Sequence, residues 1–176
     1  GADAGWSDSQ YASVGCEVLE TRREIFERAD VVLQVRALGA LSEPPPDAYR
    51  TGQTVIGLLG PYNIDDETLE MLADRRVNAF ALELLPRIGR AQSMDVLTSM
   101  ASVGGYKAVV TAADTLPSLF PMQMTAAGTV RPADVFVVGA GVAGLQAIAT
   151  SRRLGARVRA YDIRPAVKEE VESLGA

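Results

Sequence analysis

Residues 134–162 read DVFVVGAGVAGLQAIATSRRLGARVRAYD. The apolar run 135–138 predicts a buried strand, and the alanine-rich stretch after the glycines, ended by Gly155, predicts a helix. A second strand is expected before Asp162, which falls at the spacing typical of an acid that binds a ribose. The glycines alone would be weak evidence. The full order of strand, G-x-G-x-x-G turn, helix, strand and acid indicates a dinucleotide-binding βαβ unit.

The glycine turn divides its tasks among three residues. Gly139 permits the tight turn from strand to helix, Gly141 lets the backbone approach a pyrophosphate, and Gly144 lets the helix pack closely on the strand. The phosphates then lie at the helix N-terminus, where free N–H groups and the helix dipole favour an anion. The alternative is a turn that only joins strand to helix. We expect the cofactor to contact the turn residues Gly139, Ala140, Gly141, Val142, Ala143 and Gly144.

The residues after the second strand bear on the choice of cofactor. Asp162 can accept hydrogen bonds from the hydroxyls of an adenosine ribose and would repel a 2′-phosphate, so NAD is favoured over NADP. Ile163 and Arg164 follow directly and are expected at the same site. Arg164 also stands where an NADP site often carries its phosphate partner, so the choice of NAD needs a test.

The composition is that of a soluble globular protein, with 48% apolar and 22% charged residues in a chain of 176. The net charge is −5 and the basic residues are scattered, so we expect no nucleic-acid binding. Cys16 is the single cysteine and has no metal-ligand spacing around it, which favours a reducing compartment and predicts no metal site. No segment reaches 18 consecutive apolar residues, so no direct membrane span is expected.

The rest of the chain alternates short apolar runs with helical patterns, which predicts an α/β fold with parallel sheets. Helix starts are signalled by Ser7, by a capping box over residues 21–24, and by Asp65 or Asp66. A proline-rich connection covers residues 41–47 and includes Pro44. The expected strands cover residues 17–19, 31–35, 54–59 and 77–82.

Two Rossmann-like parallel-sheet domains are the predicted organisation. A first α/β domain covers residues 1–85, and the start of a dinucleotide-binding domain covers residues 86–176. A bridging helix is expected over about residues 91–119, either continuous or divided at its glycine pair, and residues 125–134 form a linker. The chain begins with Gly1 and stops one βαβ unit into a fold that needs several, so both domains are expected to be incomplete.

A second group of polar residues lies in the stretch PRIGRAQSMDVLT. If a helix begins near residue 90, then Gln92, Asp95 and Thr98 recur at three-residue intervals and share one sector of its first two turns. Arg87 would reach the same region from the preceding loop. Such a cluster can hold a carboxamide and orient a nicotinamide ring. The alternative is a capped, solvated helix start with a surface ion pair.

The chain contains no histidine, and its lysines are Lys107 and Lys168. A dehydrogenase that oxidises an alcohol or an amine usually needs such a residue as a base. Hydride exchange between two nicotinamides moves no proton at the reacting carbons and needs no base. The composition therefore fits direct hydride exchange better than substrate oxidation, although Asp95 or residues outside this chain could supply a base.

Three stretches, residues 29–37, 86–109 and 124–176, resemble the alanine dehydrogenase and pyridine nucleotide transhydrogenase family. The RAQSMD and GVAGLQAIAT strings are most similar to the NAD(H)-binding domain of the α subunit of proton-translocating NAD(P) transhydrogenase. The resemblance implies hydride transfer between NAD(H) on this domain and NADP(H) on a partner subunit, coupled to proton translocation across a membrane. It also implies a peripheral position at the cytoplasmic face of the bacterial inner membrane, membrane-spanning partner subunits and a homodimer.

The resemblance assigns the nicotinamide end to Arg87, Gln92 and Asp95, and the adenosine ribose to Asp162. Thr98 stands where the family more often has a serine, and Gly89 replaces the usual Ser or Thr. Arg36 falls near the substrate-binding lysine of alanine dehydrogenases, whose catalytic histidine has no counterpart here. The resemblance further implies that the family's opening strand and helix and most later Rossmann strands are missing, so this chain alone is expected to be inactive.

Two other functions remain open at this point. One is an alanine dehydrogenase-like amino-acid oxidoreductase. The other is a non-catalytic NAD-binding module, which the missing base suggests.

Overall fold

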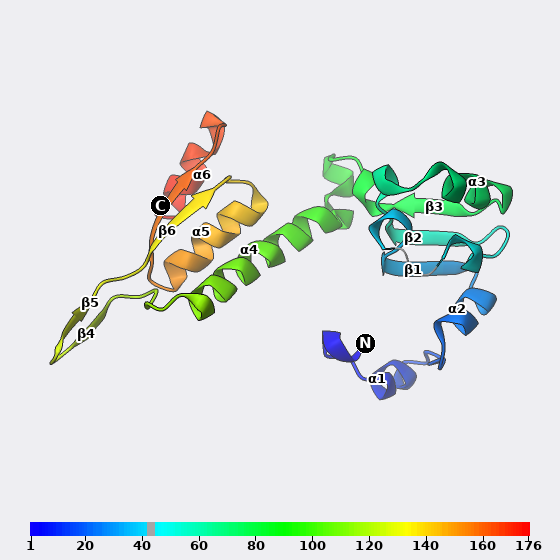
Figure 1. Cartoon of the computed structure of the whole chain (residues 1–176), viewed down its shortest axis with the longest axis horizontal. Coiled ribbons are helices and arrows are strands. Elements are labelled where there is room, and N and C mark those ends of the chain that lie inside the picture. The colour runs from blue at the N-terminus through cyan, green and yellow to red at the C-terminus, as the bar shows by residue number, and fades with distance from the viewer. Residues whose placement is uncertain (42–44) are drawn as a thin grey trace. The chain divides into compact units, whose positions relative to one another are not determined.

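The computed structural model describes residues 1–41 and 45–176, so Pro44 of the proline-rich connection lies outside the described residues. The chain divides into two compact units, Gly1–Met94 and Asp95–Ala176. Figure 1 shows the elements of each unit, and we describe the units separately.

The first unit contains a parallel sheet formed by β1 (Val31–Arg36), β2 (Thr54–Leu58) and β3 (Asn78–Ala81), in that order. Val55 of the central strand pairs with Val32 on one side and Ala79 on the other. The expected strands over residues 31–35, 54–59 and 77–82 are therefore confirmed, with small differences at their ends. The strand expected over residues 17–19 does not form, and Glu17 instead makes an ion pair with Arg28 of the following helix.

The helices of this unit begin where capping side chains satisfy free backbone N–H groups. Ser7 forms a complete capping box at α1 (Asp8–Ser13), Thr21 accepts from the Glu24 N–H in α2 (Arg22–Arg28), and Asp65 accepts from the Thr68 N–H in α3 (Asp66–Asp74). Asp65, and not Asp66, is the N-cap of α3. Short 3₁₀ helices cover Ala2–Ala4, Leu38–Ala40, Pro46–Ala48, Pro61–Asn63, Leu82–Leu84 and Gly89–Met94.

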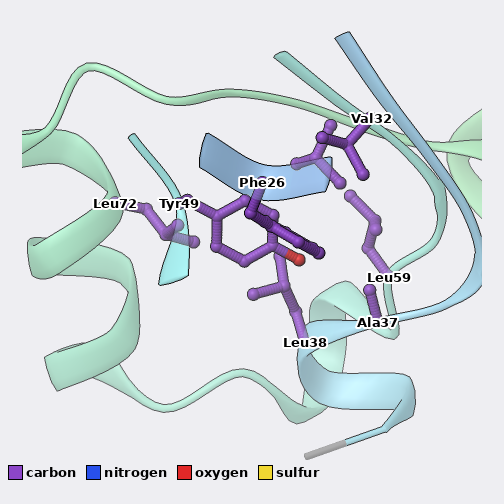
Figure 2. Close-up of a cluster of buried hydrophobic side chains, with 8 residues drawn as sticks. Phe26, Val32, Ala37, Leu38, Tyr49, Leu59 and Leu72 are labelled. Atoms are coloured by element: carbon purple, nitrogen blue, oxygen red, sulfur yellow. The ribbon is translucent and has the colours of Figure 1, made fainter. Parts of the chain in front are cut away.

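The core of the first unit is centred on two aromatic rings (Figure 2). Phe26 and Tyr49 meet edge to face, with ring centroids 5.2 Å apart. The Tyr49 hydroxyl donates a hydrogen bond of 2.8 Å to Gln34, and burial raises the pKa of Tyr49 to about 12. The buried apolar side chains around them come from α3, from β1 and β2, and from the segments that follow these two strands: Val32, Ala37, Leu38, Val55, Leu59 and Leu72.

The second unit is built around one βαβ element. β6 (Asp134–Val138) runs parallel to β7 (Arg157–Tyr161), with Asp134 opposite Arg157 and Val138 opposite Tyr161. The helix α5 (Val142–Arg153) connects them and α6 (Lys168–Ser173) follows a 3₁₀ turn at Pro165–Val167. This strand, helix and strand confirm the α/β prediction made from residues 134–162.

The long helix α4 (Val96–Thr115) is shorter than the expected span of about 91–119. Asp95 caps its first turn by accepting from the Thr98 N–H at 2.9 Å, so residues 89–94 form a separate 3₁₀ helix. At the other end Leu116 precedes Pro117, and a residue before proline disfavours helical geometry. The helix is continuous through Gly104 and Gly105.

The expected linker over residues 125–134 is partly a β-hairpin. The strands β4 (Gln123–Thr125) and β5 (Gly128–Val130) pair antiparallel, with Met124 opposite Thr129. Figure 1 shows the hairpin extending away from the helices of the second unit.

The core of the second unit lies between α4, α5 and the two parallel strands. The helices α4 and α5 approach so closely that a side chain on Gly105 would collide with the backbone of Ala143. The buried apolar side chains of this core are Val109, Phe120, Ala133, Ile148, Ala156 and Val158.

Candidate dinucleotide site

Two glycines of the turn between β6 and α5 are required by the fold itself. Gly139 has φ +93°, a conformation that is strained for residues with a side chain, and its N–H donates to the Tyr161 carbonyl at 2.7 Å. At Gly144 a Cβ atom would collide with the carbonyl oxygen of Gly139. The turn and the close helix packing that the sequence predicts for these two positions are both present.

Gly141 differs from both because nothing in its own surroundings requires a glycine. Its φ is −81°, and a Cβ placed on it would meet no described atom within 4 Å. It is also the N-cap of α5, so the first-turn N–H groups receive no side-chain cap from this position. Open space beside Gly141 is what a phosphate approaching the backbone would need.

Asp162 follows β7 directly and forms hydrogen bonds with the glycine turn and with Arg164. Its Oδ2 accepts a hydrogen bond of 2.7 Å from the Ala140 N–H, and its Oδ1 accepts one of 2.8 Å from the Arg164 N–H. The Arg164 guanidinium adds two more, from Nε to Oδ1 and from Nη2 to Oδ2, each 3.0 Å. The spacing of the motif predicts a ribose-binding role for Asp162, but it does not reveal that this residue also stabilises the glycine turn through a hydrogen bond to the Ala140 N–H.

These hydrogen-bond donors stabilise the ionised form of Asp162. The Arg164 side chain, the Arg164 N–H and the Ala140 N–H hold the pKa of the Asp162 carboxyl well below its usual range. The side chain is only 8% exposed. Asp162 is an ionised carboxylate at neutral pH, and this form offers the most acceptor positions for ribose hydroxyls.

A cavity of about 520 Å³ lies beside this carboxylate and is large enough for a nucleoside. Both Asp162 and Arg164 line it. The remaining walls include side chains from the strands and from the segment after β7, among them Phe136, Ala160, Pro165 and Val167.

The predicted nicotinamide cluster is arranged differently from the expectation. Because α4 begins only at Val96, the prediction that Gln92, Asp95 and Thr98 share the first two turns of one α-helix is wrong. Asp95 and Thr98 do meet, with Thr98 Oγ1 2.7 Å from Asp95 Oδ2 in addition to the capping bond. Gln92 belongs to the 3₁₀ helix Gly89–Met94, and Arg87 is an exposed residue of the loop before it.

Three features at the carboxyl edge of the first sheet were not predicted. Glu83 follows β3 and accepts hydrogen bonds from the Leu59 and Gly60 N–H groups, at 3.1 and 2.8 Å, which fixes the loop after β2. Leu38 is buried and has φ 51°, a costly conformation for a leucine. Arg36, at the end of β1, donates to the Ala40 carbonyl at 2.6 Å. Only the position of Glu83, two residues after the end of β3, could have suggested its role.

The glycine turn, the parallel strands and the terminal acid define a Rossmann-type α/β protein with a dinucleotide-binding fingerprint. The chain belongs to the alanine dehydrogenase/PNT family: residues 1–104 match the model of its N-terminal domain, and residues 108–176 match that of its C-terminal domain.

Curated relatives are similar along the whole chain. The NAD(P) transhydrogenase subunit alpha of Cereibacter sphaeroides is 46% identical over 176 residues, covering 100% of this chain and 33% of that protein. A Rhodospirillum rubrum protein, named as the first portion of the same subunit, is 44% identical, covering 99% of this chain and 46% of that protein. The chain therefore spans between a third and a half of the length of these relatives.

Solved structures agree with this assignment. The transhydrogenase from Sinorhizobium meliloti superposes with a TM-score of 0.88 at 50% identity, covering 97% of this chain and 50% of that chain. An L-alanine dehydrogenase superposes with a TM-score of 0.78 at 23% identity, covering 98% of this chain and 47% of that chain, which shows a shared fold. Among residues 1–41 and 45–176, no helix has the length and hydropathy needed to cross a membrane.

Proposed function

We propose that this chain is the NAD(H)-binding part of a proton-translocating NAD(P) transhydrogenase. The observation that carries the proposal is the glycine turn hydrogen-bonded to Asp162, in a chain 46% identical to a transhydrogenase α subunit. The adenosine ribose would lie at Asp162, Ile163 and Arg164, and the pyrophosphate along residues 139–144. The ionised Asp162 would repel a 2′-phosphate, which supports NAD(H) here and NADP(H) on the partner subunit.

At the nicotinamide end, Arg87, Gln92, Asp95 and Thr98 would bind and orient the ring. Hydride would pass directly between the two nicotinamides, and this step needs no acid or base from the protein. A chain without histidine suits such a reaction. The contribution of these residues would be orientation, which is effective because it fixes the donor and acceptor carbons at reacting distance.

The proposed assembly places this chain as a peripheral subunit at the cytoplasmic face of a bacterial inner membrane, beside NADP(H)-binding and membrane-spanning subunits. We also propose a homodimer. The hairpin β4–β5 supports this, because Met122, Met124 and Val130 expose large apolar side chains in and beside it.

The test mixes the full-length protein with its NADP(H)-binding partner and measures hydride transfer from NADH to an NADP analogue. We expect transfer that requires both proteins. No transfer with a correctly folded partner that binds NADP(H) would overturn the proposal. Pyruvate- and ammonia-dependent oxidation of NADH would instead favour an alanine dehydrogenase, and NAD binding without either reaction would favour a non-catalytic module.

A further inference from the structure

The carboxylate of Asp162 has no hydrogen-bonding capacity left for a ligand. A carboxylate offers about four acceptor positions. Four donors already occupy them: the Ala140 and Arg164 N–H groups at 2.7 and 2.8 Å, and Nε and Nη2 of Arg164, each at 3.0 Å. The hydroxyls of a ribose can bind Asp162 only if some of these donors leave.

The four donors differ in how easily they can leave. The Ala140 N–H belongs to the glycine turn and the Arg164 N–H to the chain just after β7, so the backbone fixes both. The Arg164 guanidinium lies at the end of a flexible side chain that is 57% exposed. Its two contacts are the ones that a ligand can replace without changing the fold.

We propose that Arg164 competes with the adenosine ribose for Asp162 and thereby sets both affinity and cofactor selectivity. This inference rests on the proposed function, that the second unit binds NAD(H). When the nucleotide enters, the guanidinium leaves Oδ1 and Oδ2, and the 2′- and 3′-hydroxyls donate to the two positions it vacates. Arg164 would then be a specificity-determining residue whose ion pair is broken on binding.

The competition has opposite consequences for the two cofactors. While Arg164 is paired with Asp162, the guanidinium compensates the negative charge that would repel a 2′-phosphate. Without the guanidinium the bare carboxylate accepts ribose hydroxyls more readily and repels a phosphate more strongly. Removal of Arg164 should therefore tighten NAD binding and weaken NADP binding. If Arg164 instead stacked on the adenine or bound a phosphate of NAD, its removal would weaken NAD binding.

The experiment is a calorimetric titration of the full-length protein carrying Arg164→Met, which keeps an apolar stem and removes the guanidinium. The control is Arg157→Met, because Arg157 is also a half-exposed arginine of this unit that pairs with an aspartate, Asp134, at 2.7 Å and at the opposite end of β6 and β7. The probes are NAD, NADP, ADP and 2′,3′-dideoxy-ADP. We expect Arg164→Met to bind NAD and ADP roughly threefold to tenfold more tightly, and the control to bind like the unmodified protein.

The dideoxy nucleotide separates competition from a general change of charge. It has no hydroxyls to donate, so its affinity should be unchanged by Arg164→Met. Arg164→Lys keeps the positive charge but cannot bind both carboxylate oxygens of Asp162. Its affinity for NAD should therefore lie between those of the unmodified protein and Arg164→Met. Equal or weaker ADP binding by folded Arg164→Met, or an equal gain for the dideoxy nucleotide, would overturn the inference alone. If the unmodified protein binds neither NAD nor ADP, the proposed function fails and the inference fails with it.

Discussion

Gly105 lies where α4 packs against α5, and replacing it with alanine should destabilise the second unit. The added Cβ would lie 2.9 Å from the carbonyl carbon and 3.1 Å from the Cα of Ala143, and would collide with the carbonyl oxygen of that residue. Contacts between carbon atoms are most favourable near ~3.5–4.0 Å. Because the obstacle is backbone, no rotamer change can relieve it, and the two helices must separate by roughly 0.5–1 Å.

The neighbouring Gly104 offers a control in which alanine should change the free energy of unfolding in the opposite direction. It is exposed on the same helix, and a Cβ there would meet no described atom within 4 Å. Gly104→Ala should therefore only gain helix propensity and raise the free energy of unfolding by about 1 kcal/mol. Gly105→Ala gains the same propensity but suffers overpacking of about 3 kcal/mol, the upper part of the usual range. Its net change should be a loss of about 2 kcal/mol.

Thermal unfolding and hydrogen exchange can measure this difference. A change of 1 kcal/mol shifts the melting temperature by about 4–8 °C in domains of roughly 60–100 residues. Gly105→Ala should thus melt about 10 °C below the unmodified protein, and Gly104→Ala a few degrees above it. Mass-spectrometric hydrogen exchange should show the loss of protection in α4 and α5, and not in the first unit. If Gly105→Ala proves as stable as Gly104→Ala, the close approach of α4 and α5 is refuted.

Three further predictions concern single side chains. Asp162→Asn should weaken NAD binding and reduce discrimination against NADP in calorimetric titration; unchanged selectivity would contradict the ribose assignment. Because the folded pKa of Asp162 is lowered, its contribution to stability is complete above the unfolded pKa of about 3.9 and is lost as pH falls below it. The asparagine variant should therefore lose less stability than the unmodified protein when denaturation is followed below that pH. Gln92→Ala should slow hydride transfer much more than it weakens NAD binding, and an equal loss of both would indicate misfolding instead. Ser151 is fully buried and its hydroxyl has no hydrogen-bond partner among the described residues, so Ser151→Ala should raise the free energy of unfolding by about 1 kcal/mol; lower stability in urea titration would reveal a partner.

The sequence predicted the parts of the fold that depend on local rules. Apolar runs located all three strands of the first sheet, and β-branched residues are frequent in two of them, β1 and β2. Ser7 located one helix start and the pair Asp65 and Asp66 another, because capping acts over a few residues. The fingerprint over residues 134–162 predicted the order of its elements and the roles of Gly139 and Gly144 within the fold. These roles follow from backbone geometry that only glycine satisfies.

The features that sequence reasoning missed depend on contacts between distant residues or on weak signals. The 3₁₀ helix at Gly89–Met94 has the composition of an α-helix, and only the cap at Asp95 separates it from α4. The hairpin β4–β5 has three-residue strands and lacks an Asn-Gly or Asp-Gly turn, the strongest hairpin signal. Residues 17–19 are apolar enough for a strand, yet they do not join the sheet.

Asp162 shows why a correct motif can still hide part of a residue's role. One of its oxygens holds the Ala140 N–H, so the same carboxylate stabilises the glycine turn and is proposed to bind the ribose. Loss of NAD binding in Asp162→Asn would therefore have two separate causes, a missing ribose acceptor and a loosened turn. Arg164→Met distinguishes them, because it leaves the Ala140 hydrogen bond in place and changes only what competes for the carboxylate. Three results together would assign the ribose to Asp162 independently of the turn. NAD should bind more tightly to Arg164→Met and more weakly to Asp162→Asn. The hydrogen-exchange rate of the Ala140 N–H should be unchanged in Arg164→Met.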